Sequence, residues 1–299
     1  MPLSREKQGE TSVLFSTFLW GVFPVITVLS LGSLDPLLSL GVSTFFASIF
    51  FACFLTVKRK WRDLKNKNAF KDVLFASLLL GIGYYALYYL GLRSTSPGNA
   101  AIIALSEVFF SFILFHLWHK HYIPKTHIYG ALLTLTGAVI ILFPNFKEFQ
   151  SGDFLILAAA FIAPLGNYFQ QRARKSVSAE AILFVRTMIG FPIIFLLAYF
   201  FHSDFSGPDI KKVMPWLILN GFVILSLSKI FWIEGIHRMS VTKATALGAI
   251  APLITLFFAW LILNESPTNF QLLSVIPMCA GVALLGIKGK QKIPALIDS

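Results

Sequence analysis

Ten apolar runs, each about long enough to cross a lipid bilayer, constrain this chain more than any other feature of its sequence. A helix needs about 20 residues to cross a hydrocarbon core of about 30 Å. Short segments rich in turn residues or charge, such as 32–36 and 94–98, separate the runs. The predicted spans are 13–31, 36–57, 73–92, 98–118, 126–143, 153–171, 181–201, 214–236, 242–263 and 269–287.

The composition indicates that lipid is the main solvent of this chain. Hydrophobic residues make up 56% and charged residues 13% of the 299 residues, whereas a soluble domain is about 45–50% apolar and about 25% charged. So little charge cannot cover a water-exposed surface of this size. The polar first ten residues do not resemble a removable signal peptide. The sequence therefore predicts an all-α integral membrane protein without a separate soluble domain.

The distribution of Lys and Arg predicts the orientation in the membrane. With the N-terminus in the cytoplasm, the inside segments hold 18 of the 25 basic residues and the outside loops hold 4. Both tails, 1–12 and 288–299, are then cytoplasmic. The net charge of +11 reflects this topology and contact with anionic lipid headgroups, not binding of nucleic acid. Short loops and the lack of a targeting segment favour a bacterial inner membrane.

The chain also resembles itself after a shift of about 145 residues. A shift of 145 places Arg93 on Arg238, and a shift of 144 places Gly137 on Gly281. The repeating unit holds five spans, an odd number, so the two halves cross the membrane in opposite directions. Inverted repeats place a substrate site near the midplane and support alternating access. The predicted halves are 13–143 and 153–287, arranged around a central cavity.

Four short segments carry a resemblance to a known family. They are Leu-Trp-Gly-Val-Phe-Pro at 19–24, Ala-Thr-Ala-Leu-Gly-Ala-Ile-Ala-Pro-Leu at 244–253, Leu-Asn-Glu at 263–265 and Gly-Val-Ala-Leu-Leu at 281–285. In order, spacing and duplication they resemble the EamA type of the drug/metabolite transporter superfamily, over nearly the whole chain. The resemblance implies ten helices in two inverted repeats, both termini inside, and a central cavity. It also implies movement of small metabolites, often export of amino acids or related compounds.

The sequence departs from that family pattern at three places. Glu107 stands in the fourth span where the second half, like the family, has Pro252. The loop that follows has His-Lys-His at 119–121, where the second half has Glu265. The family usually has an Arg in the second span, where this chain has Ser43, although the repeat-related Arg186 is kept. These departures leave the substrate open.

Ionisable side chains inside spans are costly and are therefore candidates for function. Glu107, near the midplane, could bind and release a proton. Lys229, at mid-depth in the eighth span, could bind a substrate carboxylate or pair with Glu107. Arg186 offers a planar fork for a carboxylate or phosphate. The alternatives are helix packing or an ion pair for Glu107, and snorkelling to the headgroups for Lys229. For Arg186 they are snorkelling or a bond to backbone carbonyls that locks helices together. Glu234 is expected to pair with Arg238 at i, i+4 or with another basic residue.

Aromatic and amide side chains complete the candidate site. Tyr84 and Tyr88, like Tyr85 and Tyr89, are spaced i, i+4 on the third span, so one pair is expected to line the cavity. Trp20 and Trp232 are expected in its wall, and Asn99 is a further candidate. Interhelical hydrogen bonds are the expected role of most in-span amides, which are Asn99, Asn167, Gln170 and Asn220.

No enzyme motif is present: the chain has no HExxH, GxSxG, phosphate-binding glycine loop or CxxC. We therefore expect no catalytic residue, cofactor or metal. His116, His119, His121 and His127 are expected in a solvated loop, with a metal site as the weaker alternative. Cys53 and Cys279 are expected to be small buried apolar residues and not a disulfide.

The sequence thus predicts a secondary transporter for a small polar or amphipathic metabolite, such as an amino acid, with export as the favoured direction. Without a nucleotide-binding motif, its energy must come from a proton or substrate gradient, unless it only equilibrates its substrate. The expected partners are the substrate, the lipid bilayer and, if the carrier is coupled, protons. A lipid-linked flippase, a membrane-embedded enzyme and a non-transporting scaffold are alternatives. The oligomeric state stays open.

Overall fold

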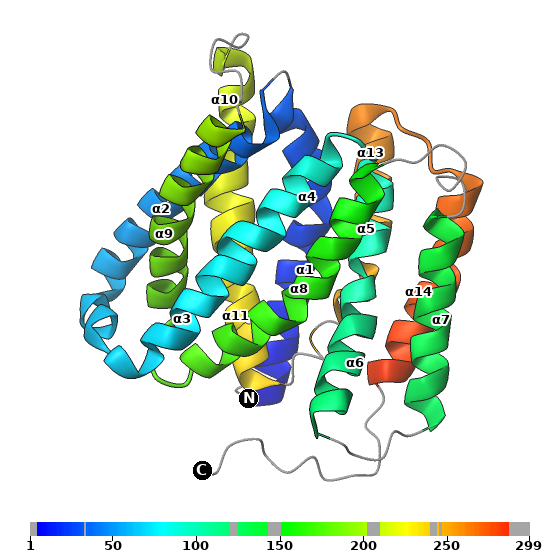
Figure 1. Cartoon of the computed structure of the whole chain (residues 1–299), viewed down its shortest axis with the longest axis horizontal. Coiled ribbons are helices and arrows are strands. Elements are labelled where there is room, and N and C mark those ends of the chain that lie inside the picture. Colours follow the sequence, from blue (N-terminus) through cyan, green and yellow to red (C-terminus); the bar gives the residue numbers. More distant parts are fainter. Residues whose placement is uncertain are drawn as a thin grey trace.

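The computed structural model describes residues 5–32, 34–119, 125–142, 151–201, 210–239, 244 and 247–286. The regular elements within these residues are all helical, and they form a bundle (Figure 1). Seven described helical segments are long and apolar enough to cross a membrane, and three shorter apolar helices cover Ile128–Ile141, Gly248–Leu263 and Asn269–Leu284. Together they correspond to the ten predicted spans, so the all-α membrane fold is confirmed.

The helices of the first half follow the predicted spans closely. Its five spans are α1 (Arg5–Leu31), α2 (Pro36–Lys58), the series α3 (Phe70–Ala76), η3 (Ser77–Tyr84) and α4 (Tyr85–Leu92), the pair α5 (Pro97–Ala104) and α6 (Ser106–His119), and α7 (Lys125–Leu142). Two short 3₁₀ turns, η1 (Trp61–Lys65) and η2 (Lys67–Ala69), connect α2 to α3.

The second half repeats this arrangement. Its five spans are α8 (Ser151–Ala173), α9 (Ala179–Phe200), the series α10 (Ile210–Leu219), η5 (Asn220–Leu227) and α11 (Ser228–Arg238), the pair η6 (Gly248–Ile250) and α13 (Ala251–Leu263), and α14 (Asn269–Gly286).

Local signals start the helices where the sequence suggests. The Asp35 side chain accepts a hydrogen bond from the Leu37 amide at 2.9 Å, and Pro36 occupies the first turn of α2. The Ser96 hydroxyl accepts one from the Asn99 amide at 3.1 Å, with Pro97 in the first turn of α5. Such caps satisfy amide groups that would otherwise lack partners in lipid, which explains why these turn segments bound the spans.

Helix packing shows the relation between the two halves. α7 packs on α14 and α2 packs on α9, so each of these pairs joins equivalent spans. α1 packs on α11 and α13, while its counterpart α8 packs on the α3–α4 and α5–α6 spans. The structure agrees with the predicted equivalence of Gly137 and Gly281. Gly137 lies against Ser274 and Met278 of α14, and Gly281 lies against Gly130 and Thr134 of α7. Gly130 and Thr134 are the positions that a shift of 144 residues places on Ser274 and Met278. The halves are therefore related by a pseudo-two-fold axis.

The third and eighth spans share a wide helical turn. η3 and η5 are both π-helical segments of eight residues, and they begin 143 positions apart in the sequence. π-turns are rare and often occur at functional sites. Here they lie directly before Tyr85 and just before Lys229, so the repeat also holds at the level of local backbone geometry.

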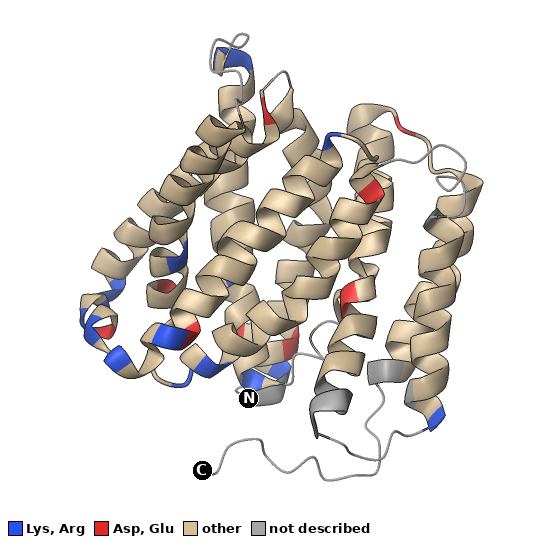
Figure 2. Cartoon of the chain, in the orientation of Figure 1, with Lys and Arg blue, Asp and Glu red and all other residues tan. Residues whose placement is uncertain are grey.

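Lys and Arg side chains gather at one end of the bundle, where α1 begins, α2 joins η1 and α14 ends (Figure 2). We call this the basic end. Glu234 lies there and pairs with Arg174 at 2.6 Å and with Arg238 at 3.0 Å. The predicted i, i+4 pair of Glu234 with Arg238 is thus confirmed, and Arg174 adds a link from α8 to α11.

The two cysteines and the four clustered histidines also had expected positions from the sequence. Cys53 is exposed on the outside of the bundle, which corrects the expectation that it is buried; lipid-facing and core-facing positions of a span are equally apolar, so its apolar surroundings in the sequence were misleading. Cys279 is partly buried, and both cysteines are free. The side chains of His116, His119, His121 and His127 lie outside the described residues.

Candidate functional site

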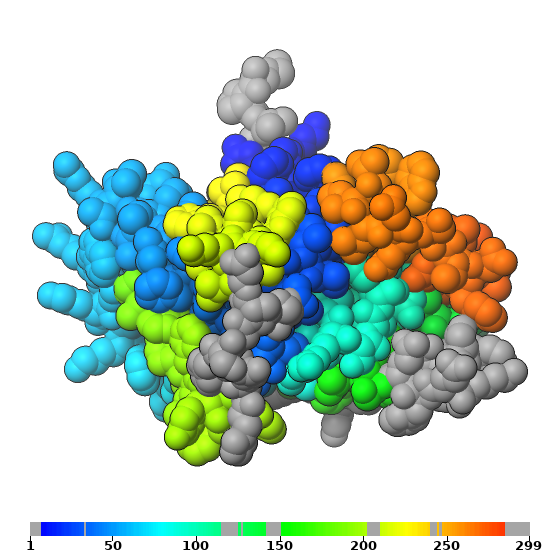
Figure 3. Space-filling model, turned by 90° about the horizontal axis from the view of Figure 1, so that it is seen from above, coloured from blue at the N-terminus to red at the C-terminus, as the bar shows by residue number. Residues whose placement is uncertain are grey.

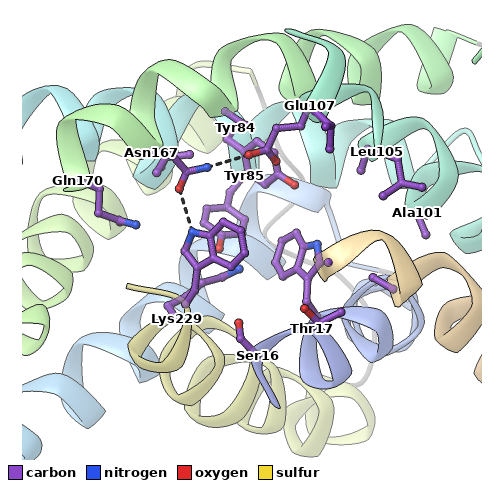
Figure 4. A pocket seen from close by; sticks show the side chains of 18 of the residues that line it. Ser16, Thr17, Tyr84, Tyr85, Ala101, Leu105, Glu107, Asn167, Gln170 and Lys229 are labelled. Atoms are coloured by element: carbon purple, nitrogen blue, oxygen red, sulfur yellow. Dashed lines mark hydrogen bonds between the residues drawn. The ribbon is translucent and has the colours of Figure 1, made fainter. Parts of the chain in front are cut away.

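A cavity lies in the middle of the bundle between the two halves. Its volume is about 110 Å³, and one water molecule needs roughly 10–15 Å³ of such space. Side chains from α1, α4, α6, α8, α9 and α11 are among those that line it (Figure 4). The space is therefore large enough for several waters or a small polar molecule.

A chain of hydrogen bonds crosses the cavity wall from α11 to α6. The Trp232 indole N–H donates to Asn167 Oδ1 at 3.0 Å, and Asn167 Nδ2 donates to Glu107 Oε1 at 2.8 Å. Figure 4 shows the Asn167 side chain pointing toward Glu107, with the hydrogen bond drawn as a dashed line. The hydrogen bond from Asn167 fixes one oxygen of the Glu107 carboxyl group, and Glu107 lines the cavity. Glu107 thus offers a positioned acceptor at mid-bundle.

The ammonium group of Lys229 lies against aromatic rings. Its Nζ is 3.3 Å from the centroid of the Trp20 ring and 5.9 Å from that of Tyr85. Contact with the ring face stabilises a cation that has left water. Among the described residues no carboxylate lies within the 4.0 Å that defines an ion pair with Lys229. The charge of Lys229 is consequently left for another anion.

Arg186 lies on α9 with only 4% of its surface exposed. Its Nη1 donates to Gln170 Oε1 at 2.6 Å, and its guanidinium carbon is 5.8 Å from the Tyr85 ring centroid. Gly81 makes room for it, since a Cβ there would lie 2.8 Å from Arg186 Cγ. The Arg186 side chain is therefore held in place where it lines the cavity and does not snorkel to the headgroups.

Aromatic side chains close the cavity on the side away from the basic end. Trp20 stacks on Phe23 with ring centroids 4.2 Å apart, and Phe23 lies 5.1 Å from Tyr88. Phe23 and Tyr88 are fully buried, whereas Trp20, Tyr84 and Tyr85 line the cavity. We call Trp20, Phe23 and Tyr88 the aromatic barrier.

Most of the candidate residues lie together. Glu107, Lys229, Arg186, Tyr84, Trp20 and Trp232 all line the cavity. Tyr88 lies behind the first layer, within the aromatic barrier. Asn99 lies elsewhere: its Oδ1 accepts a hydrogen bond from Gln271 Nε2 at 2.8 Å and so links α5 to α14. Asn99 has the helix-linking role that the sequence favoured for most in-span amides.

Among the cavity residues that the sequence did not select as site candidates are Tyr85, Asn167 and Gln170. The i, i+4 spacing suggested that Tyr84 and Tyr85 belong to separate pairs, of which one would line the cavity, but both do. Asn167 and Gln170 do bond helices together, as expected, while also facing the cavity. Their spacing of three residues on α8, one helical turn, was the signal that could have placed them on a common face.

The cavity presents one carboxylate and two cations around an aromatic wall. Glu107 can accept hydrogen bonds from an ammonium group or hold a proton, while Lys229 and Arg186 can bind a carboxylate. Taken together, an inverted two-fold bundle and a polar cavity at its centre define a polytopic helical membrane transporter.

The comparison with known proteins gives the family. The EamA-like transporter family matches residues 7–143 and again 150–287, so this chain belongs to that family, of the drug/metabolite transporter type. Each half carries one copy of the family unit, in agreement with the pseudo-two-fold packing.

Similar proteins include transporters from bacteria. The uncharacterized transporter YoaV of Bacillus subtilis is 22% identical over 90% of this chain and 94% of its own length. A probable amino-acid metabolite efflux pump of Escherichia coli is 20% identical over 96% of this chain and 98% of its own length. A crystal structure at 16% identity has a TM-score of 0.73 and covers 94% of this chain and 97% of that chain, which supports the fold.

Proposed function

We propose that this transporter is a secondary carrier that exports an amino acid or a related amphoteric metabolite from the cytoplasm by alternating access. The observation that carries the proposal is the arrangement of Glu107 opposite Lys229 and Arg186 in one cavity. A molecule with both an ammonium and a carboxylate group fits such a site, because each of its charges meets one of opposite sign. The aromatic rings of Trp20 and Tyr84 offer contact for an apolar side chain.

The likeness to the Escherichia coli protein supports both the substrate class and the direction. That protein is named a probable amino-acid metabolite efflux pump and matches this chain over nearly its whole length. The cavity itself is consistent with uptake of substrate from the basic end. Thr17, Gly248 and Trp232 line it on that side of the aromatic barrier.

The proposed membrane is the bacterial inner membrane, with the basic end in the cytoplasm. Lys and Arg gather at that end (Figure 2), and cytoplasmic segments carry such an excess. The tails 1–12 and 288–299 would then be cytoplasmic. The proposed five-helix units are 13–143 and 153–287.

Glu107 is the proposed proton-coupling residue. Asn167 donates to Oε1 and Glu107 lines the cavity, so a proton or a substrate ammonium can occupy the other oxygen of the carboxylate, but not both at once. Such competition couples the movement of one to the movement of the other. An exporter that works this way exchanges substrate for protons.

The test is uptake by purified protein in liposomes, with a panel of amino acids, with and without a pH gradient. We expect gradient-driven uptake in the wild type. Glu107→Gln keeps the hydrogen bond from Asn167 but cannot be ionised, so gradient-driven uptake is lost while exchange at equal pH persists. Glu265→Gln is the matched control, because this carboxylate lies in the loop after α13, and uptake should be unchanged.

Two results would contradict the proposal. Uptake that is indifferent to pH and to Glu107→Gln would remove the proton coupling and leave a facilitator. A panel without any substrate among amino acids, in liposomes where the protein is folded, would remove the substrate class.

A further inference from the structure

A second cluster of buried polar groups lies beyond the aromatic barrier. Asn220, the first residue of η5, donates from Nδ2 to the Tyr89 hydroxyl at 2.8 Å and to Thr27 Oγ1 at 3.2 Å. Ser30, one turn further along α1, lies 3.4 Å from the same nitrogen. The α2 backbone at Ser43 packs so closely on η5 that a Cβ at Gly221 would lie 2.5 Å from Ser43 O. We call Thr27, Ser30, Ser43, Tyr89 and Asn220 the hydroxyl cluster.

The hydroxyl cluster has unused hydrogen-bonding capacity. The Asn220 side chain is 0% exposed, yet its Oδ1 has no hydrogen-bond partner. The fully buried hydroxyl of Tyr88, which belongs to the aromatic barrier, also lacks one. Buried polar atoms are nearly always satisfied, and exceptions call for an explanation such as a water or a functional role. Such atoms in the hydroxyl cluster and in the adjoining aromatic barrier, deep in an apolar bundle, indicate a binding space that is closed in this conformation.

The pseudo-symmetry relates the hydroxyl cluster to the cavity. The offset of 143 residues that superposes η3 on η5 also places Thr27 on Gln170 and Ser43 on Arg186. Gln170 and Arg186 are hydrogen-bonded to each other and line the cavity. The hydroxyl cluster is thus the counterpart, in the other half of the repeat, of the Gln170–Arg186 side of the cavity.

Only the aromatic barrier separates the two regions along α1. Trp20, Phe23, Thr27 and Ser30 follow one another away from the basic end, and the Phe23 ring lies 6.1 Å from that of Tyr89. At the end beyond the hydroxyl cluster, α1 packs on α10 and α13, and these helices lie side by side when the bundle is seen from that end (Figure 3).

We propose that the hydroxyl cluster is the second arm of the translocation path: a chamber, closed here, that opens to the membrane face opposite the basic end and takes neutral hydrogen-bonding groups of the solute together with water. This rests on the proposed function only in that the chain works by alternating access. In an inverted repeat, exchanging the conformations of the two halves turns a cavity open to one face into one open to the other, and the hydroxyl cluster then takes the place that Gln170 and Arg186 have now.

The two arms differ in chemistry. The cavity carries Arg186, whereas its counterpart is the neutral Ser43, and the other members of the hydroxyl cluster are hydroxyl or amide groups. Hydrogen bonds to neutral groups are weaker than those that involve a charge. A charged solute is therefore held more tightly on the basic side than in the second arm, which promotes its release at the opposite face.

Cysteine accessibility tests the chamber without any solute. In a Cys53→Ser, Cys279→Ser background, Ser43→Cys is treated with a membrane-impermeant maleimide in intact cells and in inverted vesicles. Ala104→Cys, a partly exposed cavity position, reports the basic side. Ala198→Cys, 0% exposed and packed on Leu37 and Leu38, reports a buried position outside the path.

We expect Ser43→Cys to react from the face opposite to the one that labels Ala104→Cys. Its rate should be about 0.1–10% of that of an exposed thiol, the usual population of a minor conformation, and Ala198→Cys should react from neither face. Ser30→Cys, also in the hydroxyl cluster, should behave like Ser43→Cys and serves as the second variant if that one folds poorly.

Labelling of both hydroxyl-cluster cysteines from the same face as Ala104→Cys, or no faster than Ala198→Cys, would overturn the proposal. Failure of amino-acid transport is a separate result, because the labelling uses no solute. If the hydroxyl-cluster cysteines are labelled from the opposite face but no amino acid is taken up, the second arm is supported and the proposed substrate class is contradicted.

Discussion

The ammonium nitrogen of Lys229 lies 3.3 Å from the centroid of the Trp20 ring, nearer than any described carboxylate. Two halves of the chain meet in this contact, since Trp20 is on α1 and Lys229 on α11. The aromatic ring holds the cation without neutralising it, because its attraction comes from a quadrupole and not from a charge. Among the described residues Lys229 thus has no carboxylate within 4.0 Å, which leaves its Nζ available for the carboxylate of a solute.

A double-mutant cycle can measure the contact. We expect Trp20→Leu and Lys229→Met to be non-additive in thermal unfolding in detergent, with a coupling free energy of about 0.5–2 kcal/mol. Lys58→Met combined with Trp20→Leu is the control, because Lys58 lies over Phe54 and not over Trp20. That pair should be additive, and additivity of the Trp20–Lys229 pair as well would contradict the contact.

Asn167 should contribute more to stability than Trp232. Asn167→Leu leaves both the Glu107 oxygen and the Trp232 indole N–H without their partner, so we expect a loss of about 1–3 kcal/mol in the free energy of unfolding. Trp232→Phe removes one donor with its hydrogen bond, and we expect less, roughly 0.5–1.5 kcal/mol from the hydrogen bond. Thermal unfolding of both variants measures these losses. A smaller loss of stability for Asn167→Leu than for Trp232→Phe would refute the bridging role of Asn167.

Arg186 should not be replaceable by lysine. The planar guanidinium group bonds Gln170 and lines the cavity, whereas a lysine has one compact charge. If Arg186 binds the substrate carboxylate, Arg186→Lys should raise the KM of uptake about tenfold, a loss near 1.4 kcal/mol. Arg93→Lys, with a side chain 68% exposed, should leave KM unchanged. An unaltered KM in Arg186→Lys would limit Arg186 to a structural role.

The ion pairs of Glu234 should stabilise the basic end in a salt-dependent way. Glu234→Gln weakens the contacts with Arg174 and Arg238, and we expect a loss of about 1–2 kcal/mol for two partly exposed pairs. Because salt screens such charges, the difference from the wild type should shrink in high salt. Asp35→Asn is the control: it keeps the helix cap and loses only the longer pair with the exposed Arg93, at 3.6 Å. A loss in Glu234→Gln that is independent of salt would argue against these ion pairs.

Gly281 should tolerate no side chain. A Cβ there would lie 2.6 Å from the Gly130 carbonyl oxygen on α7, so Gly281→Ala must push α14 away from α7. We expect a loss of about 1–3 kcal/mol, as for other overpacked sites. Gly190→Ala, where the nearest atom would be 3.6 Å away, should be close to neutral. Equal melting temperatures of the two variants would show that the contact between α7 and α14 is looser.

The charged residues of the site could be predicted from the sequence, but the contacts that they make could not. Glu107, Lys229 and Arg186 stood out because an ionisable group inside a span is costly wherever it lies. Which of them pair depends on the helices that pack together. Lys229 and Glu107 both line the cavity but form no ion pair, since α1 lies against α11 and brings Trp20 to Lys229 first.

The neutral polar residues were harder to place. Asn99 and Asn167 look alike in sequence, both amides within apolar spans, yet Asn167 lines the cavity and Asn99 links α5 to α14. In a water-soluble helix the apolar side identifies the core, but in lipid both sides are apolar and this signal is lost. The same ambiguity led to the wrong expectation that Cys53 is buried.

What the sequence by itself determined is the set of ten spans, the gathering of basic residues at one end and the repeat of five helices. Each of these depends on the local cost of placing a polar or charged group in hydrocarbon, and that cost can be read residue by residue. The tertiary structure alone decided which side chains share the cavity, which close the aromatic barrier and which form the hydroxyl cluster. These depend on how helices far apart in the chain pack face to face, which no local energy specifies.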